Sequence, residues 1–79
     1  SYYLAEVASP TNIRWSAGEC RAMSTKAFRT GHVLGDLANS GALQQDIAKQ
    51  ALTWSKKLTK NALGLEKFAA LLDQQAVEV

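Results

Sequence analysis

The sequence predicts an all-α fold, either an antiparallel helical hairpin or a small three- or four-helix bundle, with an aromatic arm at its N-terminus. Leucine and alanine supply 23 of the 79 residues, whereas valine and isoleucine supply only 6, and this ratio favours helix over strand. Apolar residues recur at spacings of three and four along two long segments, which is the periodicity of amphipathic helices. No proline interrupts residues 42–79. We therefore expect one small helical domain spanning residues 1–79.

Residues 1–15 differ in composition from the rest of that domain. They hold both tyrosines, one of the two tryptophans and the only proline, Pro10. The run Ser9-Pro10-Thr11-Asn12 is typical of a turn, and Pro10 biases Ser9 away from helical geometry. We expect an extended or irregular arm, with a single helical turn near residues 3–8.

The first long helix is expected over residues 16–39. Ser16 and Glu19 have the spacing of a capping box, in which the side chain of each residue accepts a hydrogen bond from the main-chain N–H of the other. The apolar positions that follow lie within about 100° of one another on a helical wheel. They are Cys20, Met23, Ala27, Thr30, Leu34 and Leu37. Each of Gly31 and Gly35 costs a helix interior about 1 kcal/mol, so a break into two helices near residues 30–32 is the alternative.

The second long helix is expected over residues 42–76, after a turn at Asn39-Ser40-Gly41. Gly41 suits the left-handed position that follows a helix, and Asn39 or Ser40 suits the cap of the next one. A heptad-like stripe runs along this helix through Ile47, Ala51, Trp54, Leu58, Leu65, Phe68, Leu72 and Val79. Asn61 and Gln75 occupy two polar slots in it. Because Asn61 and Gly64 also suit a helix boundary, a break at residues 61–64 is the alternative.

Small residues form a second row beside that stripe. They recur every seven residues, at Ala48, Ser55, Ala62, Ala69 and Ala76, while Ala27, Gly31 and Gly35 recur every four on the first helix. Small side chains let helix axes approach more closely than the usual separation of about 8–10 Å. The rows predict either a tight antiparallel hairpin or a joint between subunits, with a chance alignment in an alanine-rich chain as the alternative.

The composition gives little support to catalysis or to metal binding. One cysteine and one histidine cannot form a disulfide framework or a structural zinc site. No Ser-His-Asp set and no pair of carboxylates stands at a spacing that suggests acid/base chemistry. We expect no enzyme activity, no catalytic residue, no cofactor and no metal. With no signal peptide and no run of 18 apolar residues in view, we expect a cytoplasmic protein and consider a membrane partner unfavoured.

Function is therefore expected to lie in association. A domain of this size whose apolar set is one-third alanine has few large side chains for a core of its own, so a partner would stabilise it. We expect a protein–protein assembly module, which forms a homo-oligomer or docks on a larger protein through its apolar stripe and its arm. The expected interface residues are Tyr2, Tyr3, Trp15, Ile47, Trp54, Leu58, Leu65, Phe68 and Leu72.

The alternative function is a small DNA- or RNA-binding regulatory protein. Four lysines, Lys49, Lys56, Lys57 and Lys60, lie in residues 47–62, a segment with no acidic residue, and could contact phosphates. Residues 44–62 also resemble the helix-turn-helix of small phage repressors, with Gln44, an Ile47-Ala48 pair and later apolar anchors. The segment departs from that motif at Leu52, where the motif has glycine, and at Trp54, where it has a polar residue facing the groove.

Overall fold

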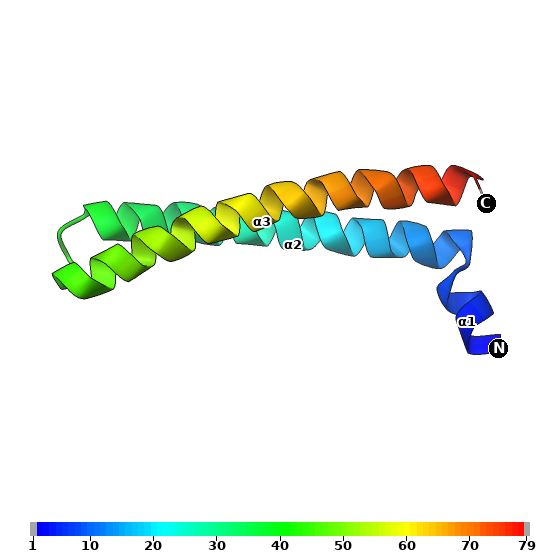
Figure 1. Ribbon diagram of the computed structural model, residues 1–79, viewed down its shortest axis with the longest axis horizontal. Helices are drawn as coiled ribbons and strands as arrows, with labels where there is room; N and C mark the ends of the chain where they lie inside the picture. Colours follow the sequence, from blue (N-terminus) through cyan, green and yellow to red (C-terminus); the bar gives the residue numbers. More distant parts are fainter. Residues whose placement is uncertain (1, 79) are drawn as a thin grey trace.

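Two long antiparallel helices make up most of the molecule. The computed structural model describes residues 2–78 and contains α1 (Tyr2–Val7), α2 (Pro10–Asn39) and α3 (Gln45–Glu78). Helices α2 and α3 pack side by side and are joined at one end by a short loop, while α1 hangs from the open end of the pair (Figure 1). The all-α prediction is confirmed in its hairpin form. None of the described helices is long and apolar enough to cross a membrane.

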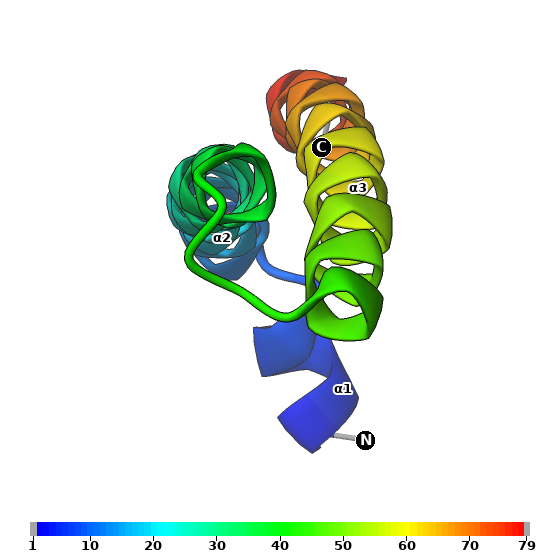
Figure 2. The same cartoon turned by 90° about the vertical axis from the view of Figure 1, so that its left-hand side faces the viewer.

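The hairpin is one layer thick. The Cα atoms of the whole molecule, α1 included, extend over 53 × 22 × 13 Å. An end-on view shows α2 and α3 next to each other, with α3 inclined relative to α2 (Figure 2). In that view α1 lies below both long helices, so it projects from one face of the layer rather than continuing its plane. Each long helix thus packs along its length against one other helix, while α1 contacts only α2. The two broad faces of the pair remain largely open.

Helix α2 begins at Pro10, so the predicted start at Ser16 is wrong. Ser9 has extended backbone geometry and its Oγ accepts a hydrogen bond of 3.2 Å from the main-chain N–H of Asn12. Proline suits the first helical position because its fixed φ is already helical and no N–H is needed there. The Ser9-Pro10 pair therefore starts a helix where a turn was expected. Ser16 lies inside that helix and donates its hydroxyl to the Asn12 carbonyl at 2.9 Å.

The predicted arm is helical over α1, close to the helical turn expected near residues 3–8, but its residues 10–15 belong to α2 rather than to an extended segment. At the C-terminal end of α1, Ala8 donates its N–H to the Leu4 carbonyl at 3.0 Å, and the Asn12 side-chain amide donates to the Val7 carbonyl at 2.7 Å. These bonds satisfy carbonyls that the end of a helix leaves without an internal partner. No residue of α1 is buried.

The predicted turn is correct in position, but the second helix begins at residue 45 rather than 42. Gly41 has a φ of +81°, the left-handed conformation expected for it. Ser40 closes α2 instead of opening α3, since its main-chain N–H and its Oγ both donate to the Leu37 carbonyl, at 3.2 and 2.7 Å. The first bond of α3 runs from the Ala48 N–H to the Gln44 carbonyl at 2.8 Å.

Both long helices are continuous. Neither the alternative break near Gly31 nor the one at residues 61–64 occurs. Packing of the two long helices against each other offsets the low helix propensity of the glycines. Helix α3 also runs unbroken through Leu52, where a helix-turn-helix would turn, so the resemblance to phage repressors does not extend to the fold. Val79, the last position of the predicted stripe, lies outside the described residues.

Candidate assembly face

Small side chains form the contact between α2 and α3. The buried positions of α2 are Ala17, Ser24 and Gly31, and those of α3 are Ala51, Ala62, Ala69 and Ala76. Ala48 and Ser55, the other members of the predicted row, are half-buried. The row of small residues on α3 therefore pairs the helices within one chain. A spacing of seven on both helices is typical of helices that coil around each other.

Two serines fix how the helices align. Ser24 of α2 donates its hydroxyl to the Ala62 carbonyl of α3 at 2.7 Å. Ser55 of α3 donates to the Gly31 carbonyl of α2 at 2.6 Å. The two bonds are related by a step of seven residues up one helix and seven down the other. A slip of the pair by one turn would break both bonds between the helices, so they favour this register.

The close approach requires glycine at two positions of α2. A Cβ built on Gly31 would lie 3.0 Å from the main-chain oxygen of Ser55 and 3.2 Å from Oγ1 of Thr59. A Cβ on Gly35 would lie 3.0 Å from Oγ of Ser55. The small row predicted on the first helix includes these two glycines but not Ser24. The signal was present, because Ser24 lies midway between Ala17 and Gly31 at steps of seven.

Large apolar side chains lie outside the helix contact. The exposed fractions are 50% for Ile47, 53% for Trp54 and 52% for Phe68. Leu58, Leu65 and Leu72 flank the alanine row and are half-buried. None of these six residues belongs to the buried core of the hairpin, although they were predicted as packing residues. Their role as an interface with another molecule remains a prediction.

The apolar stripes of the two helices share one face of the hairpin. Met23, Lys26, Ala27 and Thr30 of α2 line the same open groove as Leu58 of α3. At 100° per residue, the rest of each stripe falls on that side of the alanine row. We call this surface the apolar face. It consists of Cys20, Met23, Ala27, Thr30, Leu34 and Leu37 with Ile47, Trp54, Leu58, Leu65, Phe68 and Leu72.

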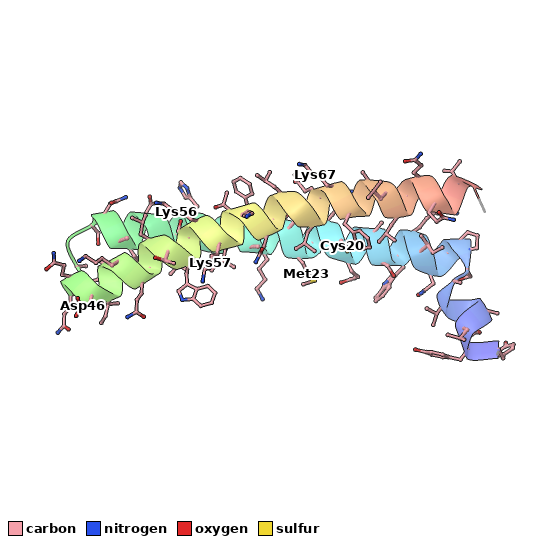
Figure 3. The ribbon with its side chains drawn as sticks, in the orientation of Figure 1. Cys20, Met23, Asp46, Lys56, Lys57 and Lys67 are labelled. Carbon is pink, nitrogen blue, oxygen red and sulfur yellow. The ribbon has the colours of Figure 1, made fainter. Side chains whose placement is uncertain are left out.

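The sticks in Figure 3 show which way this face points. Met23 of α2 and Lys57 of α3 project below the ribbon, on the side from which α1 hangs. Lys57 belongs to the rim of the face, since its Nζ lies 5.0 Å from the centre of the Trp54 ring, a cation–π distance. Asn61 is exposed within α3, so its predicted alternative role as a helix cap is wrong.

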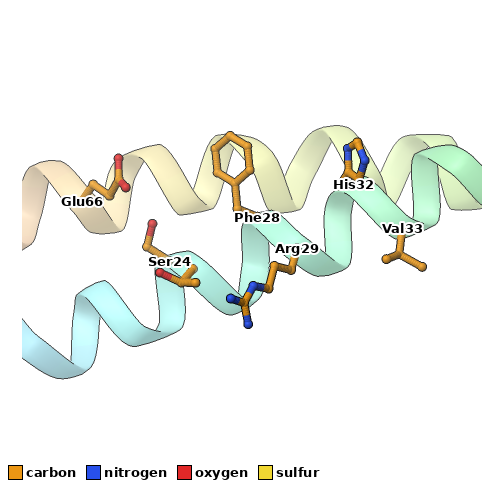
Figure 4. Close-up of a pocket in the computed structure, with 7 residues that line it drawn as sticks. Ser24, Phe28, Arg29, His32, Val33 and Glu66 are labelled. Atoms are coloured by element: carbon orange, nitrogen blue, oxygen red, sulfur yellow. The ribbon is translucent and has the colours of Figure 1, made fainter.

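The opposite face carries paired charged side chains as well as the exposed apolar residues Phe28 and Val33. Arg21 of α2 pairs there with Asp73 of α3, and His32 lies 3.4 Å from Asp36. An open hollow on this side is lined by Phe28 and His32 with Glu66 of α3 (Figure 4). The residues that the structure describes contain no group of three histidine, cysteine or acidic side chains placed to hold a metal.

The predicted lysines lie mainly on the outer side of α3. Lys49, Lys56 and Lys60 are exposed and point away from the apolar face by their helical spacing. Among the described residues, none of the four predicted lysines forms an ion pair. The predicted aromatic contacts are also exposed, at 82% for Tyr2, 71% for Tyr3 and 62% for Trp15. The fold brings the tyrosines to the open end of the hairpin.

Comparison with known protein families, characterised proteins and solved structures finds no match to this chain.

Proposed function

We propose that this chain is a non-enzymatic protein–protein assembly module that associates with another protein through its apolar face. One observation carries the proposal. The helices of the hairpin pair through alanine, serine and glycine, and this leaves a continuous set of large apolar side chains of both helices on one side. Other large apolar side chains are exposed on the remaining sides, namely Phe28, Val33, Leu52, Leu63 and Leu71. An apolar surface that continues along two helices is typical of a protein interaction site.

The size of the face supports the proposal. The apolar face runs along both long helices of a molecule 53 Å long, and a stable interface covers roughly 800 Å² of each partner. Trp54 and Phe68 are large rings of the kind that dominate binding energy when a partner covers them. Charged residues stand at the rim, as Lys26 and Lys57 do, so covering the centre of the face removes few charges from water.

The proposal is tested by photo-crosslinking from two matched positions of α3 in the full chain. A photoreactive phenylalanine analogue replaces Phe68 in one variant and Leu63 in the other. The two residues are 52% and 48% exposed and lie on different sides of α3. We expect a protein adduct from position 68 in cells expressing the chain and little or none from position 63. Equal yields at the two positions, or no adduct from position 68, would contradict the proposal.

A second candidate function is nucleic-acid binding by the outer side of α3, and the exposed lysines support it. Neutralising Lys49, Lys56, Lys57 and Lys60 with glutamine should then abolish binding to duplex DNA or to RNA. Affinity for the unmodified chain should also fall steeply as salt rises, because bound phosphates release counterions. Absence of measurable binding at low salt would remove this candidate.

A further inference from the structure

The isolated hairpin exposes more surface than a folded monomer of its mass normally does. Its accessible surface is 6000 Å², whereas the usual scaling gives about 4,700 Å² for a monomer of 8.6 kDa. Its Cα radius of gyration is 17.2 Å, against about 12 Å for a compact domain of this length. The excess surface is on the order of 1,300 Å², which exceeds the roughly 800 Å² that each partner loses in a stable dimer.

We propose that a second copy of this chain covers the apolar face, with the loops of the two hairpins at opposite ends of a four-helix bundle. This inference rests on the proposed function and names its partner. A second hairpin has the length and width of the face that it covers. Two such layers, stacked by their apolar sides, form the core of a four-helix bundle. A twofold axis makes the contact self-complementary, so it closes at two copies.

The position of α1 decides the orientation. Helix α1 hangs from the open end of the hairpin, on the side of the apolar face (Figures 1 and 2). If both loops lay at the same end, both α1 helices would enter the space that the opposite layer occupies. With the loops at opposite ends, a shift of the two copies along their common long axis lets both α1 helices clear the opposite layer and lie against its loop end, whereas no such shift frees both helices when the loops share one end. Leu37, Leu43 and Ile47 lie at that end and offer apolar contacts to Tyr2 and Tyr3.

The arrangement is tested by disulfide formation between full-length chains in which Cys20→Ala removes the native thiol. Tyr3→Cys is placed on one chain and Ala42→Cys on the other, and the two are mixed under mild oxidation. We expect the mixed disulfide between positions 3 and 42 to predominate over either symmetric one. Val33→Cys, which replaces an exposed side chain on the outer side of α2, measures chance collision. A strong symmetric disulfide at position 42, or none above the level of Val33→Cys, would overturn the orientation.

Mass measurements separate this inference from the function on which it rests. Sedimentation of the unmodified chain should give twice the chain mass, and Phe68→Glu should weaken the dimer by about 100-fold, whereas Leu63→Glu should change it less than about threefold. The adduct from a photoreactive group at position 68 should likewise have twice the chain mass. An adduct of another mass, or a monomer at high concentration, would overturn the second copy as the partner. Failure of position 68 to give more adduct than position 63 would instead overturn the proposed function.

Discussion

Ser55 and Gly31 contact each other in both directions across the helix pair. The Ser55 hydroxyl donates to the Gly31 carbonyl at 2.6 Å, and the missing side chain of Gly31 leaves space for the Ser55 main-chain oxygen, which would lie 3.0 Å from a Cβ there. The hydrogen bond therefore exists because the glycine lets the helices approach. Because the buried residues of the described helices are all small, the packing of the hairpin depends on this approach.

Gly31→Ala should destabilise the hairpin even though alanine is the better helix former. The added methyl group meets main-chain oxygen, which cannot rotate away, and overpacking of this kind costs about 1–3 kcal/mol. The gain in helix propensity is about 1 kcal/mol, so we expect a net loss. Urea unfolding followed by circular dichroism at one fixed protein concentration measures it. Gly64→Ala is the control, because nothing lies within 4 Å of its Cβ, and it should stabilise the chain.

Ala69→Leu should destabilise the hairpin by about 1–3 kcal/mol or more, because a larger side chain at a fully buried position forces the helices apart. Its neighbour Ala70 is exposed, and Ala70→Leu should change the free energy of unfolding by less than about 0.5 kcal/mol. Thermal unfolding of the two variants makes the comparison. Similar melting temperatures would argue against a helix contact built on the alanine row.

Ser24→Ala should cost about 1 kcal/mol, the net contribution of one hydrogen bond between buried groups. The Ser24 hydroxyl is the donor to the Ala62 carbonyl of the other helix. Thr25→Ala is the matched control, since the Thr25 hydroxyl bonds only to the Arg21 carbonyl of its own helix. Chemical denaturation should separate the two variants by about 1 kcal/mol in the free energy of unfolding. A larger effect at Thr25 would contradict the assigned register.

Ser9→Ala should destabilise α2 by about 1 kcal/mol, because it removes the side-chain acceptor for the Asn12 N–H. Ser16→Ala should have a much smaller effect, since Ser16 lies inside the helix. Amide hydrogen exchange of residues 11–15 measures the change directly. Faster exchange after Ser16→Ala than after Ser9→Ala would place the helix start where the sequence first suggested it.

Replacing both Tyr2 and Tyr3 with serine should leave the unfolding of the hairpin unchanged at concentrations too low for association, because no residue of α1 is buried. If α1 contacts a second molecule, the same double variant should weaken association by about tenfold through loss of aromatic contacts. Sedimentation over a range of concentrations gives the dissociation constant. An unchanged constant would show that the arm makes no contribution to assembly.

Helix type, turn position and the small-residue row could all be predicted from local pattern. Helix boundaries were less accessible, because two serines offer plausible starts for the first long helix. Ser9-Pro10 and Ser16-Glu19 each fit a known helix-start pattern, and the structure uses the first. The turn at Gly41 was predicted correctly, because the residue after a helix end often takes the left-handed backbone conformation that glycine favours. The interface with a partner stays a prediction.

The sequence by itself determined that the chain is helical, that it reverses at Gly41 and that each long helix carries a small row beside an apolar stripe. It left undecided which of these neighbouring surfaces meets the other helix. Periodicity cannot decide this, because the two rows on α3 share one period and differ only by a small rotation about the helix axis. In the tertiary structure the small row forms the contact, since alanine and glycine let the main chains approach and let Ser24 and Ser55 bond across the helix pair. Large side chains between two helices that have no further neighbour would hold the helix axes apart and would remain exposed to water at the two edges of the contact.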